Sequence, residues 1–338
     1  MRIALDAMGS DSAPRAELEG IALALADDPT LEIALVGQPQ LLESLLPSFP
    51  DRLELVPADD AVGMHESPTD AIRRKRRSSI AVCMQLLKDR QVDGVVSAGN
   101  TGAVMAFSVT SIGVIEGVHR PTLSVMFPNI HGSTLVLDIG ANVDAKPRQL
   151  LQFGIMGSTA AGFLLQKANP KIGLLSIGRE SSKGNETTLE AHRLFKGSEL
   201  NFVGNVEGND ILKGTVDVII CDGFVGNILL KYAEGLAEVL SGMLDEYLES
   251  ESKYRIRRWI SKPVLHEFIG RMDYQEYGGA LMLGVRAPVV VAHGRSTSRA
   301  IKNALRSACQ AARDDIVNHI SRRFEELNTT EEQAAALG

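Results

Sequence analysis

Six apolar runs in this chain each end in a loop built from Gly, Asn, Ser and Asp. In chain order these loops include the segments DAMGSD, SAGNTG, DIGANVD, SIGRESSKGN, CDGFVGN and AHGRSTS. A buried strand that stops in a glycine turn before a helix is the repeating unit of a parallel α/β sheet. We therefore expect an α/β fold with a largely parallel sheet and helices on both faces, in which the six loops share one edge of the sheet.

The 338 residues suit two domains or one large α/β unit, and we find no internal repeat or low-complexity linker. We expect a single catalytic unit with a central cleft over residues 1–327 and a frayed tail over 328–338. The expected strands are short, at 2–5, 32–36, 53–56, 95–96, 122–127, 133–137, 172–177, 201–203, 216–221 and 289–292, and those within 122–137 form a hairpin. The expected helices lie at 17–26, 39–46, 68–88, 149–167, 187–195, from CDGFVGN to about 250, and at 299–324.

Composition argues against several classes of protein. A net charge of −7 with 23% charged residues disfavours a general nucleic-acid binder but leaves room for a local basic patch. The cysteines Cys83, Cys221 and Cys309 are far apart, without a CxxC pair or a His/Cys metal spacing, as in a reducing cytoplasm. We find no signal peptide and no apolar stretch of roughly 18 to 20 residues, so we expect a cytoplasmic protein that is at most peripheral to a membrane.

The six loops together suggest an anion site. Small residues let the backbone approach a ligand, and successive N–H groups form a nest for phosphate or an oxyanion. Taken singly, each loop is better explained as a turn, but all six together, with Asn100, Asn142, Asn185 and Asn227 among them, favour a shared site. The GxxxxGK[ST], GxGxxG and GxSxG templates are absent, which disfavours a P-loop enzyme, a standard dinucleotide fold and the commonest hydrolase elbow.

Two features of these loops have alternative explanations. Aspartates crowd them, at Asp6, Asp11, Asp138, Asp144 and Asp222. Because they would repel an anion, they either accept N–H bonds and fix the turns or bind a divalent metal such as Mg²⁺. Lys183 and Arg179 are the nearby cations that could offset the charge. His293 is the one histidine in a candidate loop, and it is either a catalytic group or a packed structural residue.

Eight motifs then occur in a distinctive order: DAMGSD, SAGNTGA, DIGAN, KGN, NVEGND, CDGFVGN, YGGA with LMLG, and HG before a helix. On these motifs, from Arg2 to about Ala312, the chain resembles the bacterial phosphate acyltransferases of phospholipid synthesis, the acyl-[acyl carrier protein]:phosphate acyltransferases (PlsX family). The resemblance implies a fold like that of isocitrate and isopropylmalate dehydrogenases and of phosphotransacetylase, with a cleft and a homodimeric assembly. No cofactor and no resident metal are expected.

The reaction implied by the resemblance is the reversible transfer of a fatty acyl group from acyl-[acyl carrier protein] to inorganic phosphate. The acyl phosphate formed would then feed a membrane glycerol-3-phosphate acyltransferase. Direct attack of phosphate on a thioester requires a cradle for phosphate, alignment with the carbonyl and donors for the developing oxyanion. The expected partners are thus the acyl carrier protein, phosphate, the downstream acyltransferase and a second copy of the chain, without nucleic acid.

The site residues are assigned by combining this chemistry with the matched motifs. Lys183 would neutralise charge in the transition state, and Asn185, Asn227 and His293 are the other candidate catalytic residues. Binding of phosphate and thioester is assigned to Asp6, Gly9, Ser97, Asn100, Thr101, Gly102, Asp138, Asn142, Asp222 and Gly223. The cradle proper begins at Ser97 and ends at Gly102, with Asn142 and Asn227 opposite.

Two basic segments lie outside the loops. Residues 73–77, RRKRR on a helix, are best explained as a solvated face. Residues 252–277 mix six cations with aromatic and aliphatic side chains, and we expect a protruding basic amphipathic helical segment there. Such a segment suits an acidic carrier protein or an anionic membrane surface, and the alternative is a buried dimerisation element. The contact residues would be Arg255, Arg257, Arg258, Trp259, Ile260, Val264 and Leu265.

Two other functions remain compatible with the sequence. The cleft chemistry alone would also allow a phosphotransacetylase-like exchange between acyl-CoA and phosphate. A non-catalytic acyl-carrier or membrane-surface scaffold that retains the fold is the second alternative. Trapping of acyl phosphate with hydroxylamine, using each thioester in turn, would separate the three.

Overall fold

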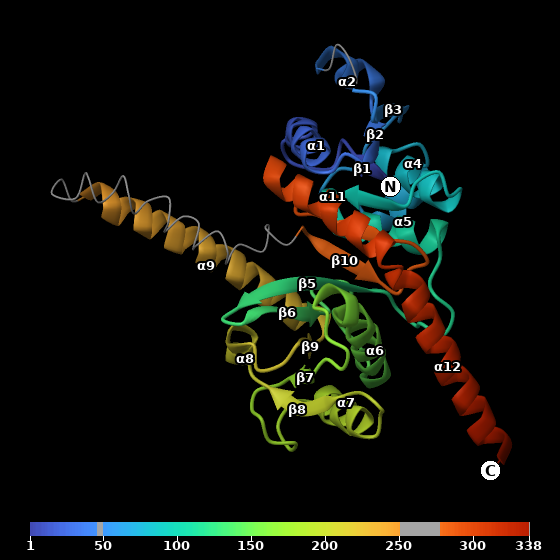
Figure 1. The fold of residues 1–338 in the computed structure, drawn as a ribbon, viewed down its shortest axis with the longest axis vertical. Helices are drawn as coiled ribbons and strands as arrows, with labels where there is room; N and C mark the ends of the chain where they lie inside the picture. The colour runs from blue at the N-terminus through green and yellow to red at the C-terminus, as the bar shows by residue number, and fades with distance from the viewer. Residues whose placement is uncertain (46–49, 251–277, 338) are drawn as a thin grey trace.

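The computed structural model describes residues 1–45, 50–250 and 278–337. Within these residues, eleven strands form one sheet in the order β3-β2-β1-β4-β11-β10-β5-β6-β9-β7-β8 (Figure 1). The strands are β1 Arg2–Asp6, β2 Glu32–Gly37, β3 Leu53–Pro57, β4 Gly94–Ser97, β5 Thr122–Asn129, β6 Gly132–Leu137, β7 Ile172–Leu175, β8 Phe202–Val206, β9 Val218–Ile220, β10 Ala280–Leu283 and β11 Val289–Val291. The expected α/β class and largely parallel sheet are confirmed, and β5 and β6 form the expected hairpin.

The sheet reverses direction at its centre. β11 runs parallel to β4, but β10 pairs antiparallel with both β11 and β5, and β5 pairs antiparallel with β6. β9 and β7 then follow the direction of β6. The carboxyl ends of β1, β4 and β11 therefore lie at one edge, and those of β6, β9 and β7 lie at the opposite edge. The expectation of one shared edge is wrong, because it assumed a single strand direction.

Helices cover both faces of the sheet (Figure 1). One face packs against α1, α6, α7, α11 and α12, and the other against α3, α4, α5, α8 and α9. Their bounds are α1 Arg15–Asp27, α3 Pro68–Arg74, α4 Ser79–Lys88, α5 Thr101–Ser111, α6 Pro147–Leu164, α7 Glu186–Lys196, α8 Gly208–Lys213, α9 Gly223–Ser250, α11 Ser298–Arg313 and α12 Ile316–Leu337, with the short α2 at Pro39–Leu45.

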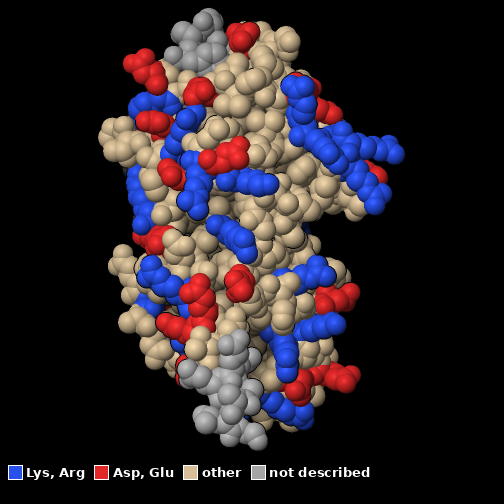
Figure 2. Space-filling view, turned by 90° about the vertical axis from the view of Figure 1, so that its right-hand side faces the viewer, with Lys and Arg blue, Asp and Glu red and all other residues tan. Residues whose placement is uncertain are grey.

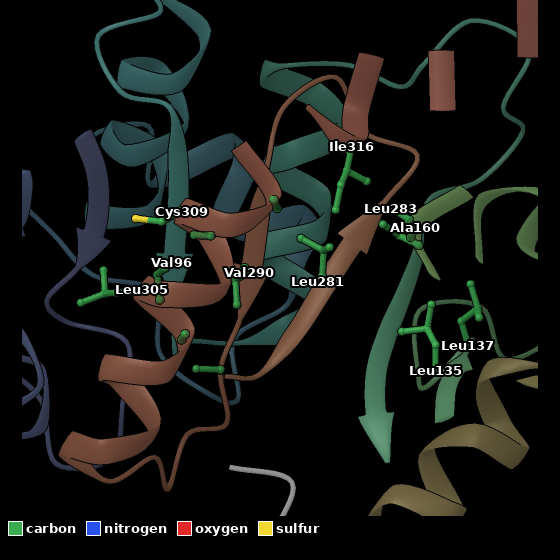
Figure 3. Packing of buried hydrophobic residues seen from close by; sticks show 14 of the residues in the cluster. Val96, Leu135, Leu137, Ala160, Leu281, Leu283, Val290, Leu305, Cys309 and Ile316 are labelled. Carbon is green, nitrogen blue, oxygen red and sulfur yellow. The ribbon is translucent and has the colours of Figure 1, made fainter. Parts of the chain in front are cut away.

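The alternation of side chains along each strand produces these two layers. Ile3 of β1 belongs to the core on the α1 and α11 face, whereas its neighbour Ala4 belongs to the core on the α4 face. In Figure 3, Leu281 and Val290 of the central strands lie beneath α11, which contributes Leu305. Full burial of one such aliphatic side chain is worth about 1.5–3 kcal/mol, so both layers contribute strongly to stability.

Two stretches that were expected to be single helices are divided. α3 ends at Arg74 and α4 begins at Ser79, because the backbone between them bonds to the segment after β3. The Ser79 N–H donates to the carbonyl of Asp60 (2.9 Å), and the Asp59 N–H donates to the carbonyl of Arg77 (3.0 Å). The closing helix is broken at Asp315, whose positive φ of 53° turns the chain between α11 and α12.

The expected tail and the expected protrusion differ in how much of them the structure describes. α12 extends to Leu337, so the helix continues through the part of the chain where a frayed tail is predicted. The expected protrusion at 252–277 lies outside the described residues, together with Arg255, Arg257, Arg258, Trp259, Ile260, Val264 and Leu265. Of the helices that the structure describes, none combines the length and the apolar character needed to cross a bilayer.

A candidate active site between the halves of the sheet

A cleft of about 280 Å³ lies over the central strands, on the face that carries α5 and α9. Its floor is apolar and comes from β5, β10 and β11, through Leu123, Val125, Ala280 and Val291. Its walls are the loop after β4, the loop after β6, the first turns of α9 and the loop after β11. Loops from opposite edges of the sheet therefore meet over its antiparallel centre.

The wall after β4 is the first turn of α5. Asn100 is the N-cap of this helix, because its Oδ1 accepts a hydrogen bond from the Ala103 N–H (3.1 Å). Its Nδ2 donates to the carbonyl of Met64 (2.9 Å), which ties the cap to the loop before α3. Gly99 and Thr101 line the cleft. The N-terminus of α5 therefore faces the cleft and directs the positive end of the helix dipole toward it.

Ser97 and Asp6 support this wall from the buried side. The Ser97 hydroxyl donates to Oδ2 of Asp6 (2.8 Å) and accepts the Gly99 N–H (3.1 Å). Both side chains are buried, and burial raises the pKa of Asp6. Gly9 lies so near that a Cβ on it would be 2.6 Å from the Gly99 nitrogen, so the close approach requires glycine. These residues position the loop without lining the cleft.

The wall after β6 is built around the buried carboxylate of Asp138. Its oxygens accept the N–H groups of Gly140 (3.2 Å), Ala141 (3.0 Å) and Asn142 (2.6 Å), and also the Asn142 side-chain amide (2.7 Å). The carbonyl of Asn142 then accepts the Gly223 N–H at the start of α9 (2.8 Å). Burial raises the pKa of Asp138, and these hydrogen bonds act in the opposite direction.

α9 begins in backbone contact with this loop. A Cβ on Gly226 would overlap the carbonyl oxygen of Asp138, so only glycine lets the helix approach so closely. Gly223, Phe224 and Asn227 line the cleft. A second helix N-terminus therefore faces the same cavity, from the side opposite α5.

Lys231, Glu234 and His293 form a connected group in the cleft wall. Lys231 Nζ donates to Oε2 of Glu234 (2.8 Å) and lies 2.7 Å from Nε2 of His293. The Arg295 N–H donates to Nδ1 of the same ring (3.1 Å). The Glu234 side chain is 8% exposed, and its Oε1 has no hydrogen-bond partner among the described residues. Of the described residues that line the cleft, Lys231 is the only lysine or arginine.

The surroundings of His293 favour its neutral form. Burial lowers its pKa below the ordinary value of 6.5, and the charge of Lys231 lowers it further. Arg295 acts in the same direction, whereas Glu234 and Asp11 act against it. The cleft therefore pairs one cation with a neutral imidazole near neutral pH.

The cleft combines an anion site with an apolar surface. Two helix N-termini and Lys231 create positive potential on its walls, which suits a phosphate group or a developing oxyanion. The floor offers only aliphatic side chains, which suit a hydrocarbon chain. A ligand with an anionic end and an apolar tail would match both.

The residues predicted from the sequence fall into three groups. Thr101, Gly223, Asn227 and His293 line the cleft. A second set supports the loops without lining it: Asp6, Gly9, Ser97, Asn100, Gly102, Asp138, Asn142 and Asp222. Lys183 is exposed in the loop after β7, and Asn185 caps α7 by accepting the Thr188 N–H (2.9 Å). A catalytic role for Lys183 and Asn185 stays a prediction.

Lys231 and Glu234 line the cleft, and sequence reasoning did not select them. They follow Asn227 by four and seven residues, so the three lie on one face of α9. A polar stripe directly after the CDGFVGN loop is the signal that could have revealed them. Their contact with His293 depends on a chain separation of 62 residues, which helical spacing cannot show.

The structure also bears on the clustered aspartates. Asp6 accepts the Met8 N–H (3.1 Å), Asp222 accepts the Val225 N–H (3.0 Å), and Asp138 accepts several such bonds. The interpretation that these three fix their turns is confirmed. In the part of the chain that the structure describes, no three His, Cys, Asp or Glu side chains are placed to hold a metal ion together.

Comparison with known proteins gives consistent matches. The model of a family described as "Fatty acid synthesis protein" matches residues 1–319. A phosphate acyltransferase from Geotalea daltonii is 43% identical over 346 aligned positions, covering 99% of this chain and 100% of the relative. One from Brevibacillus brevis is 43% identical over 331 positions, covering 97% and 98%.

Solved structures with the same architecture include two acyl-transferring enzymes. A phosphotransacetylase from Streptococcus pyogenes superposes with a TM-score of 0.64 at 17% identity, covering 93% of this chain and 94% of the other. A branched-chain phosphotransacylase from Enterococcus faecalis gives a TM-score of 0.60 at 14% identity, covering 92% and 99%. At these identities the likeness shows the fold alone, and it confirms the expected phosphotransacetylase-like architecture.

Proposed function

Because the chain belongs to the fatty acid synthesis protein family, whose curated relatives are named phosphate acyltransferase, we propose that it transfers a fatty acyl group reversibly from acyl-[acyl carrier protein] to inorganic phosphate. Membership of this family makes the protein an acyltransferase with phosphate as the acceptor. The identity of the donor and the use of the acyl phosphate in membrane phospholipid synthesis are the steps that we add.

Direct attack of phosphate on the thioester needs little covalent catalysis by the protein. An oxygen of hydrogen phosphate attacks the thioester carbonyl carbon, a C–O bond forms, and the C–S bond breaks. The proton of the hydrogen phosphate ends on the departing thiolate. Thiols are acidic, with a pKa of about 8.5 for a free cysteine, so a strong general acid is unnecessary. The protein has to hold phosphate against the carbonyl and stabilise the charge that develops on its oxygen.

The observation that carries the proposal is the convergence of the α5 and α9 N-termini and Lys231 on a cleft with an apolar floor. In this arrangement Lys231 and the helix ends bind phosphate and the oxyanion, and Thr101 and Asn227 supply side-chain hydrogen bonds. The neutral ring of His293 can pass the proton from phosphate to sulfur. Glu234 holds Lys231 in place.

An alternative remains for the identity of the acyl donor. The cleft would accept the thioester of acyl-CoA by the same geometry, as in a phosphotransacetylase-like exchange. A non-catalytic scaffold is set aside, because the chain belongs to a family of acyltransferases. A role for Lys183 rests on the sequence alone: full turnover with unchanged phosphate dependence in Lys183→Ala would remove it from the mechanism.

We also propose a cytoplasmic homodimer that associates peripherally with the inner face of the membrane and passes acyl phosphate to a membrane glycerol-3-phosphate acyltransferase. α9 extends away from the sheet (Figure 1) and exposes apolar side chains that suit an interface, namely Tyr232, Leu236, Val239, Leu240 and Met243. Contact of residues 255–265 with the carrier protein or the membrane stays a prediction.

Hydroxylamine trapping tests the function directly. The purified protein is incubated with phosphate and either acyl-[acyl carrier protein] or acyl-CoA, and acyl hydroxamate is measured. We expect hydroxamate that depends on phosphate and forms faster with the carrier-bound donor. Product from acyl-CoA alone would establish the alternative, and no product from either donor would refute both.

A further inference from the structure

The last turn of α3 and the residues that follow it present a group of arginines that the candidate active site does not use. Arg73, Arg74 and Arg76 are exposed and form no ion pair with any residue that the structure describes. Lys75 and Arg77 of the same basic run are different, because both are paired with acidic side chains of the loop before α3. Three cations of the run are therefore available to a partner.

α3 connects these arginines to the cleft, because its first residue packs beside the cleft wall. Pro68, the first residue of α3, packs against the first turn of α5, where a Cβ on Gly102 would be 2.9 Å from its Cγ. Met64, just before α3, lines the cleft itself. With a rise of 1.5 Å per residue, Arg73 and Arg74 lie about 8 to 9 Å along the axis of α3 from Pro68, and Arg76 follows the end of the helix.

An apolar groove of about 340 Å³ runs between α3, α4 and α5 next to the arginines. Ile72, Val82, Leu86 and Phe107 line it, and Arg76 forms part of its rim. Figure 2 shows Lys and Arg side chains gathered on a projecting part of the upper half of the molecule. The net charge of the whole chain is −7, so this positive surface is local.

We propose that this α3 surface, formed by Arg73, Arg74, Arg76 and the adjoining groove, docks the acidic acyl carrier protein while its acyl thioester enters the cleft. The inference rests on the proposed function and adds the place at which the donor binds. An acidic amphipathic helix matches both parts, since its carboxylates would meet the arginines and its apolar side chains would fill the groove. A membrane surface would leave the groove empty, and it would not deliver a thioester into the cleft.

The test is a charge reversal with a matched control. The variant Arg73→Glu/Arg74→Glu/Arg76→Glu is compared with Lys196→Glu/Arg306→Glu/Arg322→Glu, which makes the same change in charge on helices of the opposite face. We expect the α3 variant to raise the KM for acyl-[acyl carrier protein] about tenfold. Its KM for phosphate and its turnover of acyl-pantetheine, a donor without the carrier, should stay at wild-type values, as should all parameters of the control.

The possible outcomes are distinct. An unchanged KM for the carrier-bound donor in the α3 variant overturns the docking surface, and so does an equal rise in both variants. Loss of binding to anionic vesicles with an unchanged KM would assign the surface to a membrane instead. If the wild-type protein makes no acyl phosphate from the carrier-bound donor, the proposed function itself fails, which the wild-type assay shows before any variant is made.

Discussion

Nζ of Lys231 lies 2.7 Å from Nε2 of His293, and this contact joins the first turns of α9 to the loop after β11. The same amino group donates to Oε2 of Glu234 (2.8 Å), so the carboxylate orients it beside the imidazole. A phosphate group that enters the cleft would therefore meet a cation that is already oriented, and little reorganisation would be needed at the moment of reaction.

Lys231→Ala should lower kcat/KM for phosphate by about 10²–10³-fold, the usual cost of removing one group that stabilises transition-state charge. Acyl phosphate formation is measured over a range of phosphate concentrations. Lys213→Ala, an exposed lysine on α8, is the control and should behave as the wild type. Similar kinetics for the two variants would remove Lys231 from the site.

Glu234→Gln should lower kcat/KM by about tenfold or more, because a hydrogen bond between charged groups is worth about 1.5–3 kcal/mol. The amide keeps the shape of the side chain but loses the charge that holds Lys231. Glu238→Gln, one turn further along α9 and exposed, is the matched control. If Glu234→Asp does not recover part of the lost activity, the effect is on folding and not on the position of Lys231.

The pH dependence should reflect the lowered pKa of His293. Because burial and Lys231 disfavour the imidazolium, the ring stays neutral until the pH falls below its ordinary value of 6.5, and the acid limb of kcat/KM should lie below that point. Lys231→Met removes a positive neighbour, so it should move the pKa of His293 upward, although burial continues to hold it down. NMR titration of the ring measures this shift, and a pKa that stays the same or falls would contradict the assignment.

Gly226→Ala should lower the free energy of unfolding by about 1–3 kcal/mol, because the added methyl group overlaps the Asp138 carbonyl. Gly235→Ala on the same helix is the control: nothing lies within 4 Å of the new Cβ, and alanine should stabilise the helix by about 0.5–1 kcal/mol. Denaturant unfolding of both variants gives the comparison. Equal changes in stability would show that α9 is not held against the β6 loop as described.

Much of the local structure could be predicted because it depends on neighbouring residues. The strand at 2–5 and the hairpin within 122–137 follow from apolar runs and turn residues, and β1, β5 and β6 agree with them. The turn-fixing role of Asp138 also follows from local chemistry, because three successive N–H groups of the following loop, from Gly140 to Asn142, donate to its side chain. In both cases the partners are close in sequence.

The remaining features depend on contacts between distant segments. β10 was not expected as a strand. Its antiparallel pairing with β5 and β11 reverses the direction of the sheet, so the six loops cannot all lie at one edge. In the sequence, Lys231 and Glu234 resemble the other polar residues of a long helix. Only the fold shows that His293 lies beside them. Thr101 and Asn227 were selected from the sequence because glycine-rich loops mark helix starts, and the structure places both in the lining of the cleft.

β11 lies between β4 and β10 in the sheet, and α11, which follows it, packs on α1. During synthesis the first four strands therefore leave the ribosome with β4 unpaired on one side and α1 uncovered, a state in which nascent chains attract chaperones or pair wrongly. The loop that carries His293 and two strands of the cleft floor, β10 and β11, arrive only in this late part of the chain. Catalytic competence should consequently appear abruptly near the end of translation, and stalled or truncated chains should be inactive even when most of their residues have folded.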